Sequence, residues 1–119
     1  MPQIDSITDL LQAGIAAEGL RQKSIASNLA NLETPGYRRL DVTFEELLAK
    51  ALDSGGKIDP EAIRPALYQP KNTPIRSNGN DVGLEAEMGA LIKNSLRHTA
   101  YVRLLRKKFA QIEAAMSMR

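Results

Sequence analysis

The 119-residue sequence contains no cysteine and no tryptophan, and only three tyrosines and two phenylalanines. Without cysteine the chain can form neither disulfides nor thiolate metal sites. With so few aromatic rings, a core must be built mainly from Leu, Ile, Val, Ala and Met. The length allows one domain at most, and a composition of 43% hydrophobic and 25% charged residues is typical of a folded protein.

Long apolar runs are also missing. No stretch reaches the length that spans a bilayer. The N-terminus lacks the basic residues of a cleaved signal peptide, and Asp5, Asp9 and Glu18 interrupt any apolar stretch that follows. We therefore expect no transmembrane segment and no cleaved signal.

Residues that carry enzymatic chemistry are scarce. The single histidine, His98, lies among apolar residues at helical spacing, which is typical of a packed or rim side chain. Asp41, Glu45 and Glu46 are close in sequence, but capping and solvation explain them. The glycines form no phosphate-binding or dinucleotide motif. The sequence therefore predicts no enzyme, no metal site and no cofactor.

Charge is small overall and uneven along the chain. The formal net charge of +2 is too low to indicate nucleic-acid binding by itself. From Lys93 onward basic residues predominate, and residues 103–108 form a basic run that could bind phosphates or an acidic membrane. Apolar residues interleave with that run, which favours a solvated or inter-subunit face. A basic coiled-coil nucleic-acid-binding protein and a regulatory helical module stay open as alternatives.

Two long helices are predicted at the ends of the chain. Residues 6–33 place apolar residues at helical spacing, although Glu18 and Gln22 interrupt the stripe. Residues 84–117 carry the strongest pattern, an apolar heptad repeat along their length. The apolar residues of both helices form a predicted assembly seam: Ile7, Leu11, Ile15, Ile25, Leu29, Leu32, Leu84, Met88, Leu91, Val102, Leu105, Phe109, Ile112 and Met116.

The middle of the chain, residues 34–83, is predicted to hold a turn, one short helix and an extended arm. The short helix is expected at 44–53, where Thr43 and Glu46 match a capping box. The later prolines rule out another long helix, and so long a loop suits an arm on a neighbouring subunit. We therefore predict an all-α fold of one unit, 1–119, with two long terminal helices packed as a coiled-coil-like pair and an irregular Pro/Gly-rich middle.

The most specific motif follows the first predicted helix. The run Thr34-Pro35-Gly36-Tyr37 predicts a type II turn, with Gly36 at positive φ. Together with Ala26-Ser27-Asn28 and Ala30-Asn31, this run resembles the N-terminal signature of flagellar rod and hook proteins. The predicted signature-turn residues are Asn28, Asn31, Thr34, Pro35, Gly36 and Tyr37.

A second resemblance lies at the start of the C-terminal helix. Residues 79–88, Gly-Asn-Asp-Val-Gly-Leu-Glu-Ala-Glu-Met, are similar to that region in proximal rod proteins of the bacterial flagellum, the FlgB type. Gly83 departs from this family, which tends to have Asp there, but glycine is still a tolerated N-cap. The middle segment is too short for the large surface domain of distal rod and hook proteins.

The resemblance implies a structural subunit of the proximal rod in the flagellar basal body. It implies helical assembly through the terminal helices into the axial drive shaft of motility. The implied partners are further copies, other rod proteins, and the proteins that join the export gate to the rod base, with no nucleic acid. The resemblance also implies type III export without a cleaved signal, and a rod that crosses the periplasm.

The turn motif gives a first test. Val resists positive φ, whereas Arg38 is expected to be a surface or rim residue. Gly36→Val should therefore impair assembly more than Arg38→Ala does, as measured by the yield of assembled rods. Normal assembly of the Gly36→Val protein would show that position 36 does not need positive φ.

Overall fold

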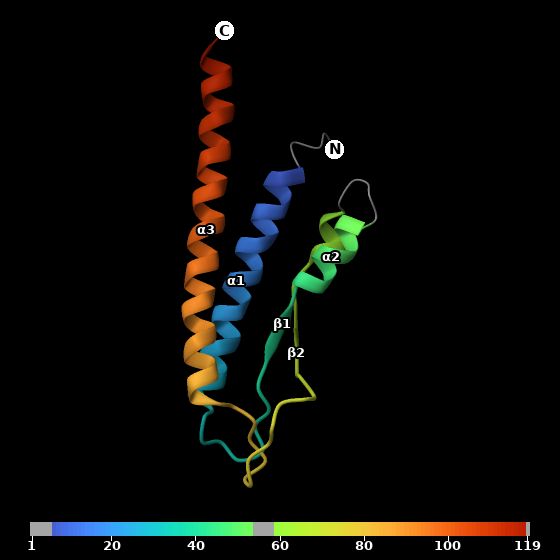
Figure 1. Ribbon diagram of the computed structural model, residues 1–119, viewed down its shortest axis with the longest axis vertical. Helices are drawn as coiled ribbons and strands as arrows, with labels where there is room; N and C mark the ends of the chain where they lie inside the picture. Colours follow the sequence, from blue (N-terminus) through green and yellow to red (C-terminus); the bar gives the residue numbers. More distant parts are fainter. Residues whose placement is uncertain (1–5, 54–58, 119) are drawn as a thin grey trace.

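A computed structural model describes residues 6–53 and 59–118 as an elongated molecule of 66 × 27 × 19 Å. The elements are α1 (Ser6–Ala30), β1 (Asp41–Thr43), α2 (Glu45–Asp53), the short 3-10 helix η1 (Pro60–Ile63), β2 (Ala66–Tyr68) and α3 (Leu84–Ser117). Figure 1 shows α1 running antiparallel beside α3, with β1, β2 and α2 on the other side of α1. The lengthwise packing of the two terminal helices is therefore as predicted.

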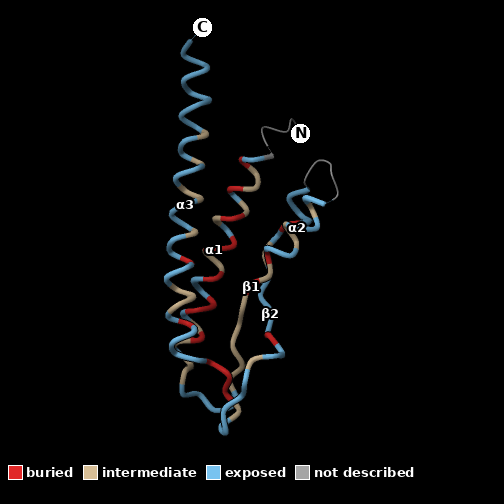
Figure 2. The backbone as a smooth tube through the Cα atoms, in the orientation of Figure 1, coloured by how far each residue is buried: buried red, intermediate tan, exposed pale blue. Residues whose placement is uncertain are grey.

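The two long helices differ in how much of them is covered. The 34-residue α3 extends well past the N-terminal end of the 25-residue α1 (Figure 1). Buried residues follow the length of α1 but only the first half of α3 (Figure 2). The C-terminal part of α3 is thus a projection with few of the described residues packed against it.

Of the six helix ends predicted from local pattern, four match the structure, one differs by one residue and one by three. The range predicted for α3 is confirmed, and Gly83 is its N-cap, in an extended conformation with no side-chain capping bond. Helix α2 begins at Glu45, one residue later than predicted, because Thr43 ends strand β1. Helix α1 stops at Ala30 instead of residue 33. There the Asn31 amide donates to the Ser27 carbonyl oxygen at 2.8 Å, and the chain tightens into turns.

The all-α prediction is wrong in one respect, because the middle segment contains a small sheet. Strands β1 and β2 pair antiparallel, with Val42 opposite Leu67. Each strand has only three residues, which is too short for a readable alternation of apolar and polar side chains. The pairing joins segments of the chain on either side of α2, and only the folded chain reveals it.

The apolar core lies between α1 and the middle segment. Ala17 of α1, Phe44 and Ile63 are buried together, and Leu48 of α2 packs against them. Asp59 accepts a hydrogen bond from the Glu61 backbone N–H at 3.1 Å and caps η1, which places Ile63 in this core. The middle segment is therefore folded onto its own α1, and the extended arm predicted for residues 55–83 is packed where the structure describes it.

Close approach of α1 and α3 depends on Gly14. A Cβ atom built at Gly14 would lie 2.7 Å from the Tyr101 ring of α3, a distance that real Cβ contacts do not reach. At Gly19, in the same helix, a Cβ atom would meet nothing within 4 Å. Gly14 thus makes room for an aromatic ring, whereas Gly19 lowers helix propensity without a packing role.

These two glycines form a matched pair for a stability test. Gly14→Ala should lower the free energy of unfolding by about 1–3 kcal/mol, because the ring must move or the helices must separate. Gly19→Ala should raise the free energy of unfolding by up to about 1 kcal/mol through helix propensity. Urea unfolding followed by circular dichroism measures both. Equal stabilisation by the two substitutions would contradict the packing of Tyr101 on Gly14.

Candidate assembly site

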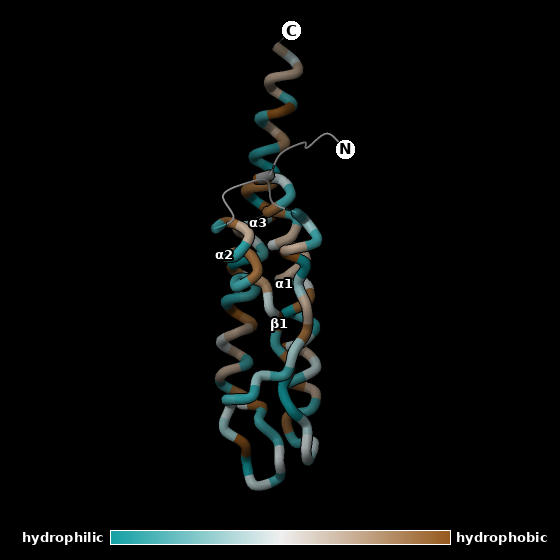
Figure 3. The backbone as a smooth tube through the Cα atoms, turned by 90° about the vertical axis from the view of Figure 1, so that its right-hand side faces the viewer, coloured by the Kyte–Doolittle hydropathy of each residue, from teal (hydrophilic) through white to brown (hydrophobic). Residues whose placement is uncertain are grey.

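The predicted seam splits into a covered part and an uncovered part. Buried or half-buried members are Leu11, Ile15, Ile25, Leu29, Leu32, Leu91, Val102 and Leu105. Exposed members are Ile7, Leu84, Met88, Phe109, Ile112 and Met116. Apolar and hydrophilic residues alternate along the α3 projection, and no other described element lies beside its C-terminal end (Figure 3). A single chain thus buries much of the N-terminal seam and leaves most of the C-terminal seam exposed.

The face that α3 turns toward α1 is largely polar. Its buried residues are Glu87 and Asn94, and the ring of Tyr101 follows after another seven residues. Glu87 and Tyr101 lie one residue before Met88 and Val102 of the predicted seam. Sequence reasoning missed Glu87 and Asn94, because a polar residue beside an apolar stripe is indistinguishable from an ordinary surface residue. His98, expected as a packed or rim residue, is exposed.

A buried carboxylate joins the two helices at mid-length. Glu18 is fully buried, and it accepts hydrogen bonds from Arg21 at 2.6 Å, Arg97 at 3.0 Å and Asn94 at 3.1 Å. The Asn94 amide also donates to the Glu18 backbone carbonyl at 2.6 Å. A buried charge is tolerated only when it is paired and hydrogen-bonded in this way. At the position where Glu18 interrupts the apolar stripe, α1 and α3 are therefore joined by a polar contact.

Arg21 extends this cluster to α2 by an ion pair with Glu45. Burial disfavours the charged guanidinium, but the hydrogen bond to Glu45 and the negative charges of Glu18 and Glu45 outweigh it, so the pKa of Arg21 is raised. Partial burial likewise opposes the Glu45 carboxylate, but its bond to Arg21 prevails and the pKa of Glu45 is lowered. One arginine thus connects the helix pair to the middle segment.

The signature turn has the predicted backbone. Gly36 has φ of +75°, and the Tyr37 N–H donates to the Thr34 carbonyl oxygen at 3.2 Å. A second turn lies against it, in which Gly79 has φ of +83°. The Gly36 N–H donates to the Asn78 carbonyl oxygen at 2.9 Å, and a Cβ at Gly79 would lie 3.3 Å from the Gly36 Cα. The two regions of family resemblance therefore touch through their glycine turns.

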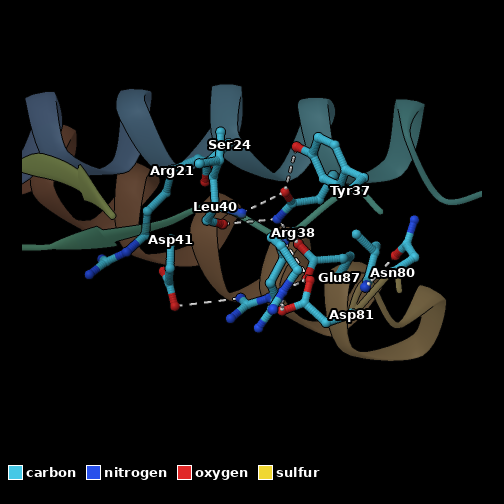
Figure 4. Close-up of polar contacts among 12 residues, drawn as sticks. Arg21, Ser24, Tyr37, Arg38, Leu40, Asp41, Asn80, Asp81 and Glu87 are labelled. Atoms are coloured by element: carbon cyan, nitrogen blue, oxygen red, sulfur yellow. Dashed lines mark hydrogen bonds and ion pairs between the residues drawn. The ribbon is translucent and has the colours of Figure 1, made fainter. Parts of the chain in front are cut away.

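Asn28 holds the segment after the turn against both long helices. Its amide donates to the Leu40 carbonyl oxygen at 2.9 Å and to Glu87 of α3 at 2.7 Å. Its carbonyl oxygen accepts from the Leu40 N–H at 2.9 Å and from the Tyr37 hydroxyl at 3.1 Å. Tyr37, Leu40 and Glu87 converge below α1 in Figure 4. Every hydrogen-bonding direction of this fully buried amide is used, since an amide has two donor hydrogens and one acceptor oxygen.

Asn80 makes a similar set of hydrogen bonds beside the turn that contains Gly79. Its amide donates to the carbonyl oxygens of Asn31 at 2.9 Å and Thr34 at 2.8 Å. Its own side-chain oxygen accepts from the Val82 N–H at 2.7 Å. Asn80 is fully buried, so these bonds replace lost contacts with water. It ties the end of α1 and the signature turn to the residues that lead into α3.

Two arginines complete the junction. Arg38 pairs with Asp81 at 3.2 Å, and Arg39 pairs with Glu87 at 3.2 Å, while its backbone N–H donates to Asp81 at 2.5 Å (Figure 4). Asp81 is buried, and the Arg38 side chain is 33% exposed. Arg38 is thus a rim residue, as expected. It also neutralises a buried carboxylate, so Arg38→Ala carries a cost that the sequence did not reveal.

Among the described residues, no group of three His, Cys, Asp or Glu side chains is placed to hold a metal ion. Within the same residues, no helix combines the length and apolar character needed to cross a membrane. The arrangement couples two long helices at one end and exposes an apolar stripe at the other.

Comparison with known proteins identifies the class. Residues 11–38 match the family model described as "Flagella basal body rod protein". This segment contains Asn28, the signature turn and most of α1, so the chain is of the flagellar basal body rod class.

Relatives over most of the chain define the family more closely. The chain is 30% identical to "Flagellar basal body rod protein FlgB" of Borreliella burgdorferi, over 66% of this chain and 72% of that protein. It is 25% identical to the FlgB protein of Bacillus subtilis, over 90% of both chains. It is 29% identical to that of Cereibacter sphaeroides, over 88% of this chain and 93% of that protein. The chain belongs to the FlgB family of flagellar basal body rod proteins.

The Asn28 junction can be tested with a nearly isosteric change. Asn28→Asp removes both donors and puts a carboxylate beside Glu87 and the Leu40 carbonyl, so we expect it to lower the free energy of unfolding by about 3 kcal/mol. Asn72→Asp, at an exposed position in the middle segment, is the control and should change stability by less than about 0.5 kcal/mol. Urea unfolding measures both. A tolerated Asn28→Asp change would show that the junction does not depend on the amide.

Proposed function

We propose that this chain is a structural subunit of the proximal rod of the flagellar basal body, and that it polymerises through its terminal helices into the axial drive shaft of motility. Its partners are further copies, other rod proteins and the proteins that join the rod base to the export gate. In this proposal the subunit leaves the cell by type III export without a cleaved signal, and the rod crosses the periplasm. Membership of the FlgB family supports the rod assignment.

The observation that carries the proposal is the exposed apolar stripe on the projection of α3. Phe109 is 48% exposed and Met116 is 69% exposed in the single chain. Exposed apolar patches of this kind mark surfaces that another protein covers. Long helices that share such contacts along an axis form a stiff assembly, which is what the transmission of torque requires.

Neither the nucleic-acid-binding alternative nor the regulatory alternative explains the exposed apolar stripe equally well. A basic nucleic-acid-binding helix needs its cations on the contact face, whereas here Leu104 and Phe109 interleave with the basic residues. A regulatory helical module that works as a soluble monomer does not require an apolar seam that is half exposed to water.

Phe109 provides the decisive substitution. Burial of its ring between subunits should contribute roughly 1.5–3 kcal/mol, and Phe109→Asp removes this and places a charge at the contact. We expect cells with Phe109→Asp as their only copy to make the protein but to lack rods, hooks and swimming. Because the ring is half exposed in the single chain, the stability of the purified protein should change by no more than about 0.5 kcal/mol.

Gln111→Asp is the matched control, since residue 111 is exposed and lies about 200° around the helix from Phe109. It introduces the same charge away from the stripe and should leave rods intact. Electron microscopy of basal bodies and swimming in soft agar are the measurements. Rods in Phe109→Asp cells would show that the stripe is not an assembly surface, and normal swimming after deletion of the whole gene would refute the rod assignment.

A further inference from the structure

We propose that the projection of α3 packs on the middle segment of a second copy of this chain, basic side against acidic side; this inference rests on the proposed function. The tail is defined as residues 103–117 of α3. The arm is defined as residues 41–53 and 59–68, which contain β1, α2, η1 and β2. The contact is therefore between different surfaces of two identical subunits.

The tail combines an apolar stripe with a basic edge. Its exposed apolar residues include Phe109, Ile112 and Met116, which lie on one side of the helix. Arg103 and Arg106 are exposed, and Arg106 precedes Phe109 by one helical turn, so their side chains lie along the same side of the helix. The tail's only acidic residue is Glu113. A partner for this surface must offer both apolar area and negative charge.

The arm offers both. Its exposed acidic residues include Glu46, Asp53 and Asp59, and among the described residues neither Glu46 nor Asp53 forms an ion pair. Its large exposed apolar residues are Leu52, Leu67 and Tyr68, which are 56%, 48% and 46% exposed. Spacing of seven residues puts Glu46 and Asp53 on one side of α2, the side away from the core residue Leu48. The arm thus combines negative charge with exposed apolar area, whereas the tail combines positive charge with exposed apolar area.

A second copy is the occupant because the tail cannot reach its own arm. Helix α3 is continuous to Ser117, and the tail points past the end of α1, while the arm lies across α1 from α3 (Figure 1). A contact between two different surfaces of identical chains does not close on itself unless its rotation closes a ring. Repeated along an axis, it generates an open filament, which agrees with a rod.

Exchange of charge between the two surfaces tests the pairing in the full-length chain. The tail variant carries Arg103→Glu and Arg106→Glu, and the arm variant carries Glu46→Lys and Asp53→Lys. Exposed ion pairs each contribute roughly 0.2–1 kcal/mol, so replacing two attractions by repulsions should weaken self-association about tenfold or more in either variant alone. An equimolar mixture of the two variants restores opposite charges at every contact and should associate as the natural chain does.

The control variant carries Lys23→Glu and Lys71→Glu, at exposed positions outside both surfaces, and should associate normally. Sedimentation velocity in 50 mM NaCl measures association, and 500 mM NaCl should weaken that of the natural chain. Circular dichroism checks that each variant is folded. If the tail variant fails to fold, Arg106→Glu alone replaces it in the same mixture.

Three results in solution would overturn the pairing. They are a natural chain that stays monomeric to about 1 mM, variants that associate as well as the natural chain, and a mixture that fails to recover. Loss of duplex DNA binding in the tail variant with unchanged self-association would assign the basic edge to nucleic acid instead. Rods that still form in cells carrying the tail variant would sink the pairing while leaving the rod function intact.

The absence of cysteine allows a direct second measurement. Chains with Glu113→Cys, an exposed position about one helical turn after Phe109 on the tail, and chains with Ala49→Cys on the outer side of α2 should form a mixed disulfide when oxidised together. A chain with Lys71→Cys in place of Ala49→Cys should not. A tail thiol that links to position 71 as readily as to position 49 would contradict the proposed contact.

Discussion

The fully buried amide of Asn28 is the contact on which the rest of the structure depends. Its bonds reach the backbone of Leu40, the hydroxyl of Tyr37 and the carboxylate of Glu87, so it touches the return segment and α3 from a position on α1. A buried group with all its partners is stabilising, and the same group without them costs several kcal/mol. The chain can therefore fold only with these segments in one arrangement.

Polar contacts also set the register of the two long helices. An apolar interface tolerates sliding, because one aliphatic contact resembles the next along the helix. The contacts of Glu18 prevent such sliding, since its buried carboxylate requires Arg97 and Asn94 at one height on α3. The helix pair is thus aligned by charge and amide groups, while most of the large apolar side chains of α3 stay exposed for other contacts.

Local backbone structure could be predicted from the sequence, whereas contacts between distant segments could not. The positive φ of Gly36 follows from Pro35 and Gly36 alone, and the bounds of α3 follow from its own periodicity. The pairing of β1 with β2 depends on two segments that show no pattern by themselves. The same holds for Glu87 and Asn94, whose burial is decided by α1. The specific sequence run that identified the family turned out to contain the residues that hold the junction.

The position of that junction has a mechanical consequence. The glycine turns, Asn28 and Asn80 all lie at one end of the helix pair, so α3 is clamped near its N-terminus and uncovered toward its C-terminus (Figure 2). A helix held at one end is displaced most at its free end. The rigidity of a filament built from such subunits must then come from the contacts that neighbouring subunits add along the uncovered part of α3. Stiffness is accordingly acquired on assembly and is not a property of the isolated subunit.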